Sequence, residues 1–198
     1  HRFSAGIDPV NSAYPLRRGE VFATPALALT YSDAGTSGVS RNFHRWGRKH
    51  RLMHGDTPRK VLLNSWEGIY FDVNEPVVKE MMGDIADMGG ELFVLDDGWF
   101  GDKYPRTGDK TGLGDWVIDR NKLPDGISGL LSAADSLGIR FGIWIEPEMA
   151  NLHSELYDKH PDWIVQAPGR DPVFGRGGTQ LVLDLGNPAV QQHVFDVF

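Results

Sequence analysis

Short apolar runs of strand length alternate with stretches of helical periodicity from residue 60 onward, and this alternation constrains the fold more than any other feature. The apolar runs cover residues 60–66, 92–95 and 139–145. Asn74 can cap a helix after the first run, and Gly138 can end a helix before the third. Because strands that alternate with helices form parallel sheets, the pattern predicts an α/β fold with about three βα units.

Each apolar run ends in residues that carry chemistry. In parallel α/β folds the carboxyl ends of the strands and the loops after them build the ligand site, in a (β/α)8 barrel and in an open doubly wound sheet alike. The turn after the first run reads Asn-Ser-Trp-Glu-Gly and has no glycine-rich phosphate motif, which disfavours a nucleotide. The residues concerned are Trp66, Asp96, Asp97, Trp99, Trp144, Glu146 and Glu148.

Carboxylates beside flat aromatic rings suit a carbohydrate ligand. The apolar face of a sugar ring packs on an indole, and its hydroxyl groups need acceptors in fixed directions. Two other interpretations stay open at this point: adjacent acidic side chains can hold Mg²⁺ or Ca²⁺, and each Trp can be an ordinary core residue. Since no calcium-loop spacing accompanies the acidic residues, we expect no metal site and no cofactor.

Overall charge and cysteine content exclude several classes of function. The 20 Lys and Arg residues face 27 Asp and Glu residues, a net charge of -7, which disfavours a nucleic-acid partner. The absence of cysteine excludes thiol nucleophiles and Cys-ligated metals. No apolar run approaches the roughly 18 to 20 residues that span a bilayer, so no membrane partner is predicted. With no targeting signal visible, the cytoplasm is the expected location.

The sequence divides into three parts. Residues 1–33 contain short extended segments between Pro and Gly residues, and we interpret them as the end of a β-sandwich domain. Residues 34–58 are rich in Gly and Ser and then basic, which predicts a helix and a linker. The basic side chains form either a site for an anion or partner or a solvated helix face, and the acidic chain favours the second. Residues 59–198 hold the α/β pattern.

The chain starts at His1 without Met and ends within a helix that begins at Pro188, so we interpret it as a segment of a longer protein.

Five motifs together resemble glycoside hydrolase family 36, the bacterial-type α-galactosidases or melibiases. The resemblance implies the first part of a (β/α)8 barrel, preceded by the end of a β-supersandwich domain. It also implies hydrolysis of terminal non-reducing α-D-galactose from small α-galactosides with retention of configuration, by a homo-oligomeric enzyme, a tetramer. The motifs are Asn64 to Gly68 (NSWEG), Phe93 to Gly101 (FVLDDGWFG), Leu113 to Trp116 (LGDW), Gly142 to Met149 (GIWIEPEM) and Leu181 to Leu185 (LVLDL).

The resemblance assigns roles to five residues of this chain. Asp96 and Asp97 would bind the 4- and 6-hydroxyl groups of galactose, and Trp66 and Trp144 would wall the galactose subsite. Arg176 matches a family arginine that reaches the same subsite, although the family more often has Asn shortly after it, where this chain has two glycines. Glu146 and Glu148 are either direct contacts or structural acids at the strand end.

The catalytic residues of the family are not among the motifs of this chain. The resemblance implies a nucleophilic Asp in a Lys-Trp-Asp motif on the fourth barrel strand and an acid/base Asp near the sixth, whereas no Lys-Trp-Asp occurs here. Both are expected beyond residue 198, so this segment is predicted to supply much of the galactose-binding subsite of the parent enzyme and to be inactive by itself. Two alternatives remain: a sugar-binding barrel that has lost catalysis, and another barrel glycosidase that uses Asp97 and Glu146 as its catalytic pair.

Overall fold

The computed structural model describes residues 3–7 and 13–197, and the chain divides into two compact units, His1–Pro58 and Arg59–Phe198. The second unit begins where the sequence pattern changes to alternating strands and helices. Each unit is described by itself. No helix among the described residues is both long and apolar enough to cross a membrane.

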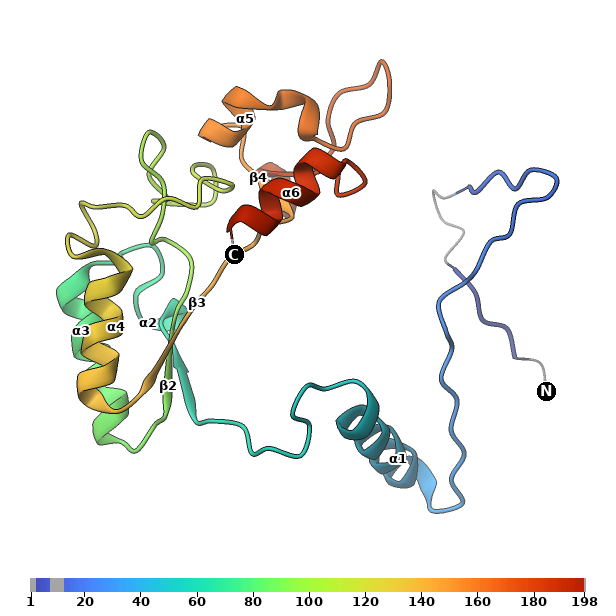
Figure 1. Cartoon of the computed structure of the whole chain (residues 1–198), viewed down its shortest axis with the longest axis horizontal. Coiled ribbons are helices and arrows are strands. Elements are labelled where there is room, and N and C mark those ends of the chain that lie inside the picture. The colour runs from blue at the N-terminus through green and yellow to red at the C-terminus, as the bar shows by residue number, and fades with distance from the viewer. Residues whose placement is uncertain (1–2, 8–12, 198) are drawn as a thin grey trace. The chain divides into compact units, whose positions relative to one another are not determined.

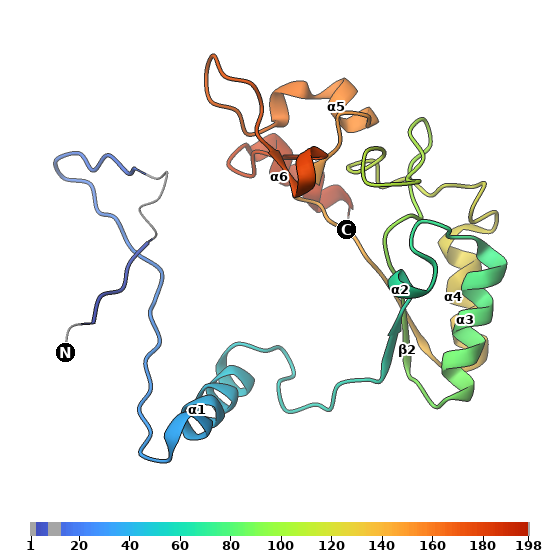
Figure 2. The ribbon, with the colours of Figure 1, turned by 180° about the vertical axis from the view of Figure 1, so that it is seen from behind.

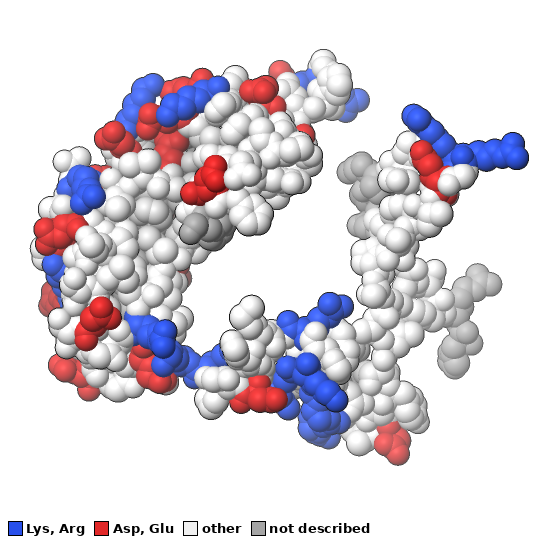
Figure 3. Space-filling view, viewed as in Figure 1, with Lys and Arg blue, Asp and Glu red and all other residues white. Residues whose placement is uncertain are grey.

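In its described part, residues 3–7 and 13–58, the first unit contains one helix, α1 (Gly35–His50), which lies within the segment predicted to hold a helix and a linker (Figure 1). Its basic side chains are exposed, and they give the blue surface over α1 in Figure 3. Asn42 of α1 donates hydrogen bonds to Thr30 Oγ1 at 2.9 Å and to the carbonyl oxygen of Tyr31 at 3.1 Å. These bonds tie the helix to the extended segment before it.

The extended segments predicted before α1 do not form strands. Residues 20–23 and 26–31 run as irregular chain, with no strand pairing in the described part of the first unit. A strand needs a neighbour for its backbone N–H and C=O groups, and apolar composition does not supply one. Their origin in a β-sandwich domain therefore stays a prediction.

The second unit begins with the predicted parallel sheet. β1 (Leu62–Asn64), β2 (Leu92–Leu95) and β3 (Arg140–Ile143) pair in that order and all run parallel. A short helix, α2 (Trp66–Ile69), follows β1. The two crossover helices, α3 (Glu75–Asp87) and α4 (Gly126–Leu137), lie side by side in both ribbon views (Figures 1 and 2). The prediction from the sequence located all three strands and both crossover helices correctly, but it overestimated the lengths of the first and third strands.

Local signals explain where these helices begin and end. The side chain of Asn74 accepts a hydrogen bond from the backbone N–H of Val77 at 3.1 Å, which caps α3 as predicted. Gly138 ends α4 in the left-handed conformation, with φ of 70°, which a residue with a side chain adopts only at a cost. These two signals therefore mark the start of α3 and the end of α4.

A second, smaller sheet follows β3 and was not predicted. β4 (Met149–Ala150), β6 (Gln180–Val182) and β5 (Phe174–Gly175) form an antiparallel sheet in that order. Two α-helices and two 3₁₀ turns connect or follow the strands of this small sheet. They are α5 (Glu155–Lys159), the 3₁₀ turns η1 (Pro161–Trp163) and η2 (Arg176–Gly178), and α6 (Pro188–Val197).

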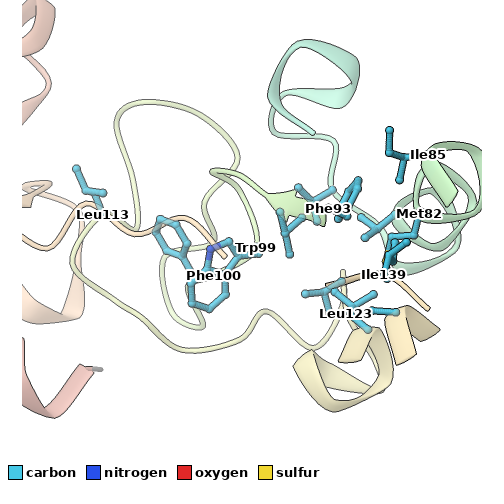
Figure 4. Packing of buried hydrophobic residues seen from close by; sticks show 13 residues of the cluster. Met82, Ile85, Phe93, Trp99, Phe100, Leu113, Leu123 and Ile139 are labelled. Atoms are coloured by element: carbon cyan, nitrogen blue, oxygen red, sulfur yellow. The ribbon is translucent and has the colours of Figure 1, made fainter. Parts of the chain in front are cut away.

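The core of the second unit lies between the parallel sheet and its helices and continues into the loop after β2. Figure 4 shows Met82 of α3 near Phe93 of β2, and Trp99 together with Phe100 in that loop. All four are buried. The loop after β2 therefore belongs to the core at its base, which gives the strand ends a rigid support. A separate buried cluster, which includes Leu181 of β6 and Val190 of α6, supports the small sheet.

Candidate functional site

The three parallel strands end side by side because of their register. Asn64 pairs with Val94, and Leu95 pairs with Ile143. Residues that immediately follow the strands are thus brought to one edge of the sheet. The described residues include no group of three or more His, Asp or Glu side chains arranged to hold a metal ion.

Asp96 directly follows β2, and its carboxylate is held from two sides. Asn64 Nδ2 donates to Asp96 Oδ2 at 2.6 Å, and the backbone N–H of Asp97 donates to Asp96 Oδ1 at 2.8 Å. The backbone N–H of Asp96 donates to Ser65 Oγ at 3.0 Å. The residue is half-buried, so an oriented carboxylate remains open to a ligand.

Asp97 lies in a different environment from Asp96, although the family resemblance assigns both side chains to hydroxyl groups of galactose. It is 3% exposed, and both of its oxygens accept hydrogen bonds from Arg106: Oδ1 from Nε at 2.8 Å and Oδ2 from Nη2 at 2.7 Å. Arg106 is fully buried. A bidentate pair of this kind fixes the direction of a carboxylate as well as its charge. Any ligand contact of Asp97 would have to use the lone pairs that Arg106 leaves unoccupied.

The three predicted tryptophans at the strand ends also differ from one another. Trp99 is 5% exposed and packs edge-on against Phe100, so the ordinary-core interpretation holds for it. Trp66 and Trp144 are half-buried. The Trp66 ring stands edge-on to Phe71 at 5.0 Å between ring centroids, and the backbone N–H of Trp144 donates to Leu95 O at 2.8 Å. Both therefore keep ring surface that a sugar could contact.

Trp116 is an aromatic residue of this region to which the sequence assigned no role. Its ring lies 6.2 Å from that of Trp144 and 6.2 Å from that of Trp99, and it is half-buried. Its presence in the LGDW motif was the available signal. The strand-end rings are thus extended by a residue from the loop after β2.

Arg176 meets Glu146 rather than the aspartates. Arg176 Nη1 lies 3.5 Å from Glu146 Oε2, and Gln180 Nε2 lies 3.5 Å from the same oxygen. Burial raises the pKa of the Glu146 carboxyl, and the charge of Arg176 opposes this shift. Gln180 is fully buried, and its Oε1 has no hydrogen-bond partner among the described residues. Glu146 thereby links the end of β3 to the turn that carries Arg176, while Glu148 is exposed.

Hydrogen bonds and ion pairs join the five predicted site residues only in part. Asn64 contacts both Asp96, through its Nδ2, and the backbone N–H of Trp66, through its Oδ1 at 2.8 Å. Among the described residues, the side chain of Arg176 forms an ion pair with Glu146 and with none of the other four predicted site residues. A common cavity around all five residues therefore stays a prediction.

Polar and aromatic side chains at the carboxyl ends of parallel strands, supported by a packed loop, define the class of this unit: an α/β protein with the strand-end arrangement that barrels and open doubly wound sheets share. The family model described as Melibiase matches residues 21–198. The chain therefore belongs to the melibiase family, glycoside hydrolase family 36.

Named relatives agree with this assignment. The chain is 43% identical to alpha-galactosidase AgaA of Geobacillus stearothermophilus, over 98% of this chain and 26% of the relative. It is also 43% identical to probable alpha-galactosidase C of Aspergillus flavus, over 96% of this chain and 26% of the relative. The chain thus spans about a quarter of the length of these relatives.

Solved structures show the same similarity. A crystal structure of an AgaA variant in complex with 1-deoxygalactonojirimycin matches with a TM-score of 0.88 and 42% identity, over 96% of this chain and 26% of that chain. The alpha-galactosidase TtGalA of Thermus thermophilus, in complex with stachyose, matches with a TM-score of 0.63 and 26% identity, over 79% of this chain and 32% of that chain. The α/β architecture of this chain is therefore that of part of a family 36 α-galactosidase.

Proposed function

We propose that the full-length protein hydrolyses terminal non-reducing α-D-galactose from small α-galactosides, and that this chain supplies part of the galactose subsite. The observation that carries the proposal is the oriented, half-buried carboxylate of Asp96 at the end of β2 in a melibiase-family chain. A fixed acceptor of this kind discriminates between sugars, because a hydroxyl group of the wrong configuration leaves it unpaired.

The partial exposure of three other side chains supports their assignment to the same subsite. Trp66 and Trp144 offer half-buried indole surface for the apolar face of the sugar ring. Arg176 has about half of its side chain exposed, and it is held on one side by Glu146. In this proposal Arg176 donates to a sugar hydroxyl, while Glu146 keeps its guanidinium in place.

Retaining hydrolysis needs two carboxyl groups about 5 to 5.5 Å apart, one to attack the anomeric carbon and one to protonate the leaving oxygen. Asp97 is unsuited to either role, since it is buried and both of its oxygens accept hydrogen bonds from Arg106. This disfavours a glycosidase that uses Asp97 with Glu146. We propose that the nucleophile and the acid/base lie outside the 198 residues of this chain, as the family resemblance implies.

The test compares two substrates that differ at a single carbon. The full-length protein is assayed with the 4-nitrophenyl glycosides of α-galactose and of α-glucose, whose 4-hydroxyl groups have opposite configuration. Hydrolysis of the galactoside in clear preference, with α-galactose as the first product seen by proton NMR, supports the proposal and the retaining mechanism. Equal rates on both glycosides, or β-galactose as the first product, contradict it.

A sugar-binding protein without catalysis would give a third result. It would bind galactose in a calorimeter and release no nitrophenol from either glycoside. Asp96→Asn then tests the subsite in either case, because it removes the acceptor charge at the strand end. Asp84→Asn is the matched control, since Asp84 is an exposed aspartate on α3. Loss of galactose affinity in the first variant alone supports the role of Asp96.

A further inference from the structure

We propose that Arg106 is a positioning residue for sugar binding: it acts through Asp97 and, together with Asn151 and Lys122, fixes the loop that carries the strand-end site. The inference rests on the proposed galactose-binding function. No family motif pointed to Arg106, and its part is defined by the buried contacts around it.

Arg106 is the largest fully buried side chain of the described residues, and four of its N–H bonds are directed at named partners. Nε and Nη2 hold the two oxygens of Asp97 at 2.8 and 2.7 Å. Nη1 donates to Thr111 O at 3.1 Å and to Asn151 Oδ1 at 3.0 Å. A guanidinium presents its donors in one rigid plane, so these bonds fix the orientation of the Asp97 carboxylate relative to the loop.

Asn151, also fully buried, extends the contact to two more segments. Its Oδ1 also accepts from the backbone N–H of Leu113 at 2.9 Å. Its Nδ2 donates to Asp109 O at 2.9 Å and to Thr179 O at 2.7 Å, so the amide makes four hydrogen bonds. Thr179 lies just after the turn that carries Arg176. The loop after β2 is thereby fastened to the small sheet.

Lys122 closes the same loop from the other side. Its Nζ donates to Phe71 O at 3.0 Å, Gly98 O at 2.6 Å and Arg106 O at 2.9 Å. All three N–H donors of the ammonium are thus paired with carbonyl groups from three separate stretches of chain. Burial lowers the pKa of Lys122, and the nearby acids Asp119, Asp97 and Asp72 oppose this shift.

The path from Arg106 to the ligand has two steps. The fork of Arg106 fixes the side chain of Asp97, and the backbone N–H of Asp97 donates to Asp96 Oδ1 at 2.8 Å. A shift of Asp97 therefore moves a donor that orients the half-buried carboxylate of Asp96. Because hydrogen-bond strength falls steeply with misalignment, a small displacement would weaken sugar binding before the fold is lost.

Arg106→Lys in the full-length protein is the primary test, because lysine keeps the charge and loses the planar fork. The dissociation constant of galactose, KM and kcat for 4-nitrophenyl α-galactoside, and the melting temperature are measured for each variant. We expect the dissociation constant and KM to rise together by roughly tenfold, with kcat changed much less, because Arg106 acts on the binding of the sugar and contacts no reacting atom. Arg120→Lys is the matched control, as Arg120 is exposed and donates to Pro124 O.

A double-mutant cycle shows whether Arg106 acts through Asp97. If it does, Asp97→Asn combined with Arg106→Met weakens galactose binding no more than Asp97→Asn alone. Additive losses of affinity overturn the proposed path. A lower melting temperature with unchanged affinity of the folded protein assigns Arg106 a purely structural role and also overturns it.

Two further outcomes of the experiment, variants that do not fold and a wild type that binds no galactose, are also informative. If the Arg106 variants do not fold, Asp97→Glu replaces them: it keeps the charge opposite Arg106 and moves the carboxylate out of the bidentate geometry, and unchanged galactose affinity in this variant overturns the proposal. If the wild-type protein binds no galactose, the proposed function fails and this inference fails with it. If the wild type binds and Arg106→Lys binds equally well, only the inference fails.

Discussion

The two aspartates at the end of β2 differ in burial and in their hydrogen-bond partners. Asp96 is half-buried and held by neutral groups, whereas Asp97 neutralises a buried guanidinium. We expect Asp97→Asn to lower the free energy of unfolding by about 3–5 kcal/mol, because it leaves the charge of Arg106 buried without its partner. Asp96→Asn should cost less than about 1 kcal/mol. Urea denaturation of the full-length variants measures both, and equal losses would contradict the distinction.

Glu146 gives a pH-dependent prediction at the same scale. Burial raises its pKa above the ordinary value of 4.5. The folded protein therefore holds this proton more tightly than the unfolded chain, and the resulting stabilisation is present below pH 4.5 and lost as pH rises through the raised pKa. The melting temperature of the wild type, relative to Glu146→Gln, should fall as the pH rises from 4.5 through the raised pKa and then level off.

The neighbouring Glu148→Gln serves as the control for this experiment, since Glu148 is exposed. If the difference between the wild type and Glu146→Gln does not change with pH, the charge of Arg176 cancels the effect of burial on the pKa of Glu146. If it increases with pH, the charge of Arg176 outweighs burial. Either result would contradict the prediction.

Among the elements, α3 offers a matched pair of substitutions. Asn74→Ala removes the cap that accepts from Val77 N–H and should destabilise the protein by about 1 kcal/mol. Gly83→Ala should stabilise it by about 0.5–1 kcal/mol, because Gly83 lies inside the helix and a Cβ there meets nothing within 4 Å. Thermal denaturation of both variants checks the two signs, and a destabilising Gly83→Ala would indicate a contact outside the described residues.

The loop after β2 depends on close backbone approach. Gly112 has φ of 78°, and a Cβ there would lie 2.5 Å from Tyr104 O, whereas a Cβ on Gly108 would meet nothing within 4 Å. We expect Gly112→Ala to cost at least about 2 kcal/mol and to weaken galactose binding, since the strained loop carries Arg106. Gly108→Ala should change neither property by much. Similar effects of the two substitutions, read from urea denaturation and calorimetry, would show that the loop adapts.

Elements and site residues differ in how far the sequence predicts them. The crossover helices and parallel strands follow from apolar periodicity, the Asn74 cap and the Gly138 stop, which are local signals. Arg106, Asn151 and Lys122 carry no such signal, because their partners are backbone carbonyl groups and buried side chains at irregular distances along the chain, 9 residues from Arg106 to Asp97 and 45 from Arg106 to Asn151. For the same reason the sequence could not separate Asp96 from Asp97, and it could not show that the segments before α1 lack a pairing partner.

At the scale of the whole molecule, the parallel sheet has unpaired edges. β1 and β3 each have one strand neighbour in the described part of the chain. Apolar side chains on and beside these edges are exposed, among them Val61 at 59%, Leu62 at 48% and Ile143 at 38%. An open edge with exposed apolar side chains is a template for pairing with another chain. The full-length protein would need further structure to cover both edges.

We therefore expect residues 1–198, expressed alone, to aggregate or to behave as a loosely packed state. Such a state keeps its far-ultraviolet circular dichroism, binds a hydrophobic dye and melts without a cooperative transition, because secondary structure survives while specific packing is lost. The full-length protein, measured under the same conditions, is the control. A sharp, reversible and concentration-independent melt of the isolated 198 residues would mean that the buried network around Arg106 and the core behind β2 suffice to hold this unit without neighbours.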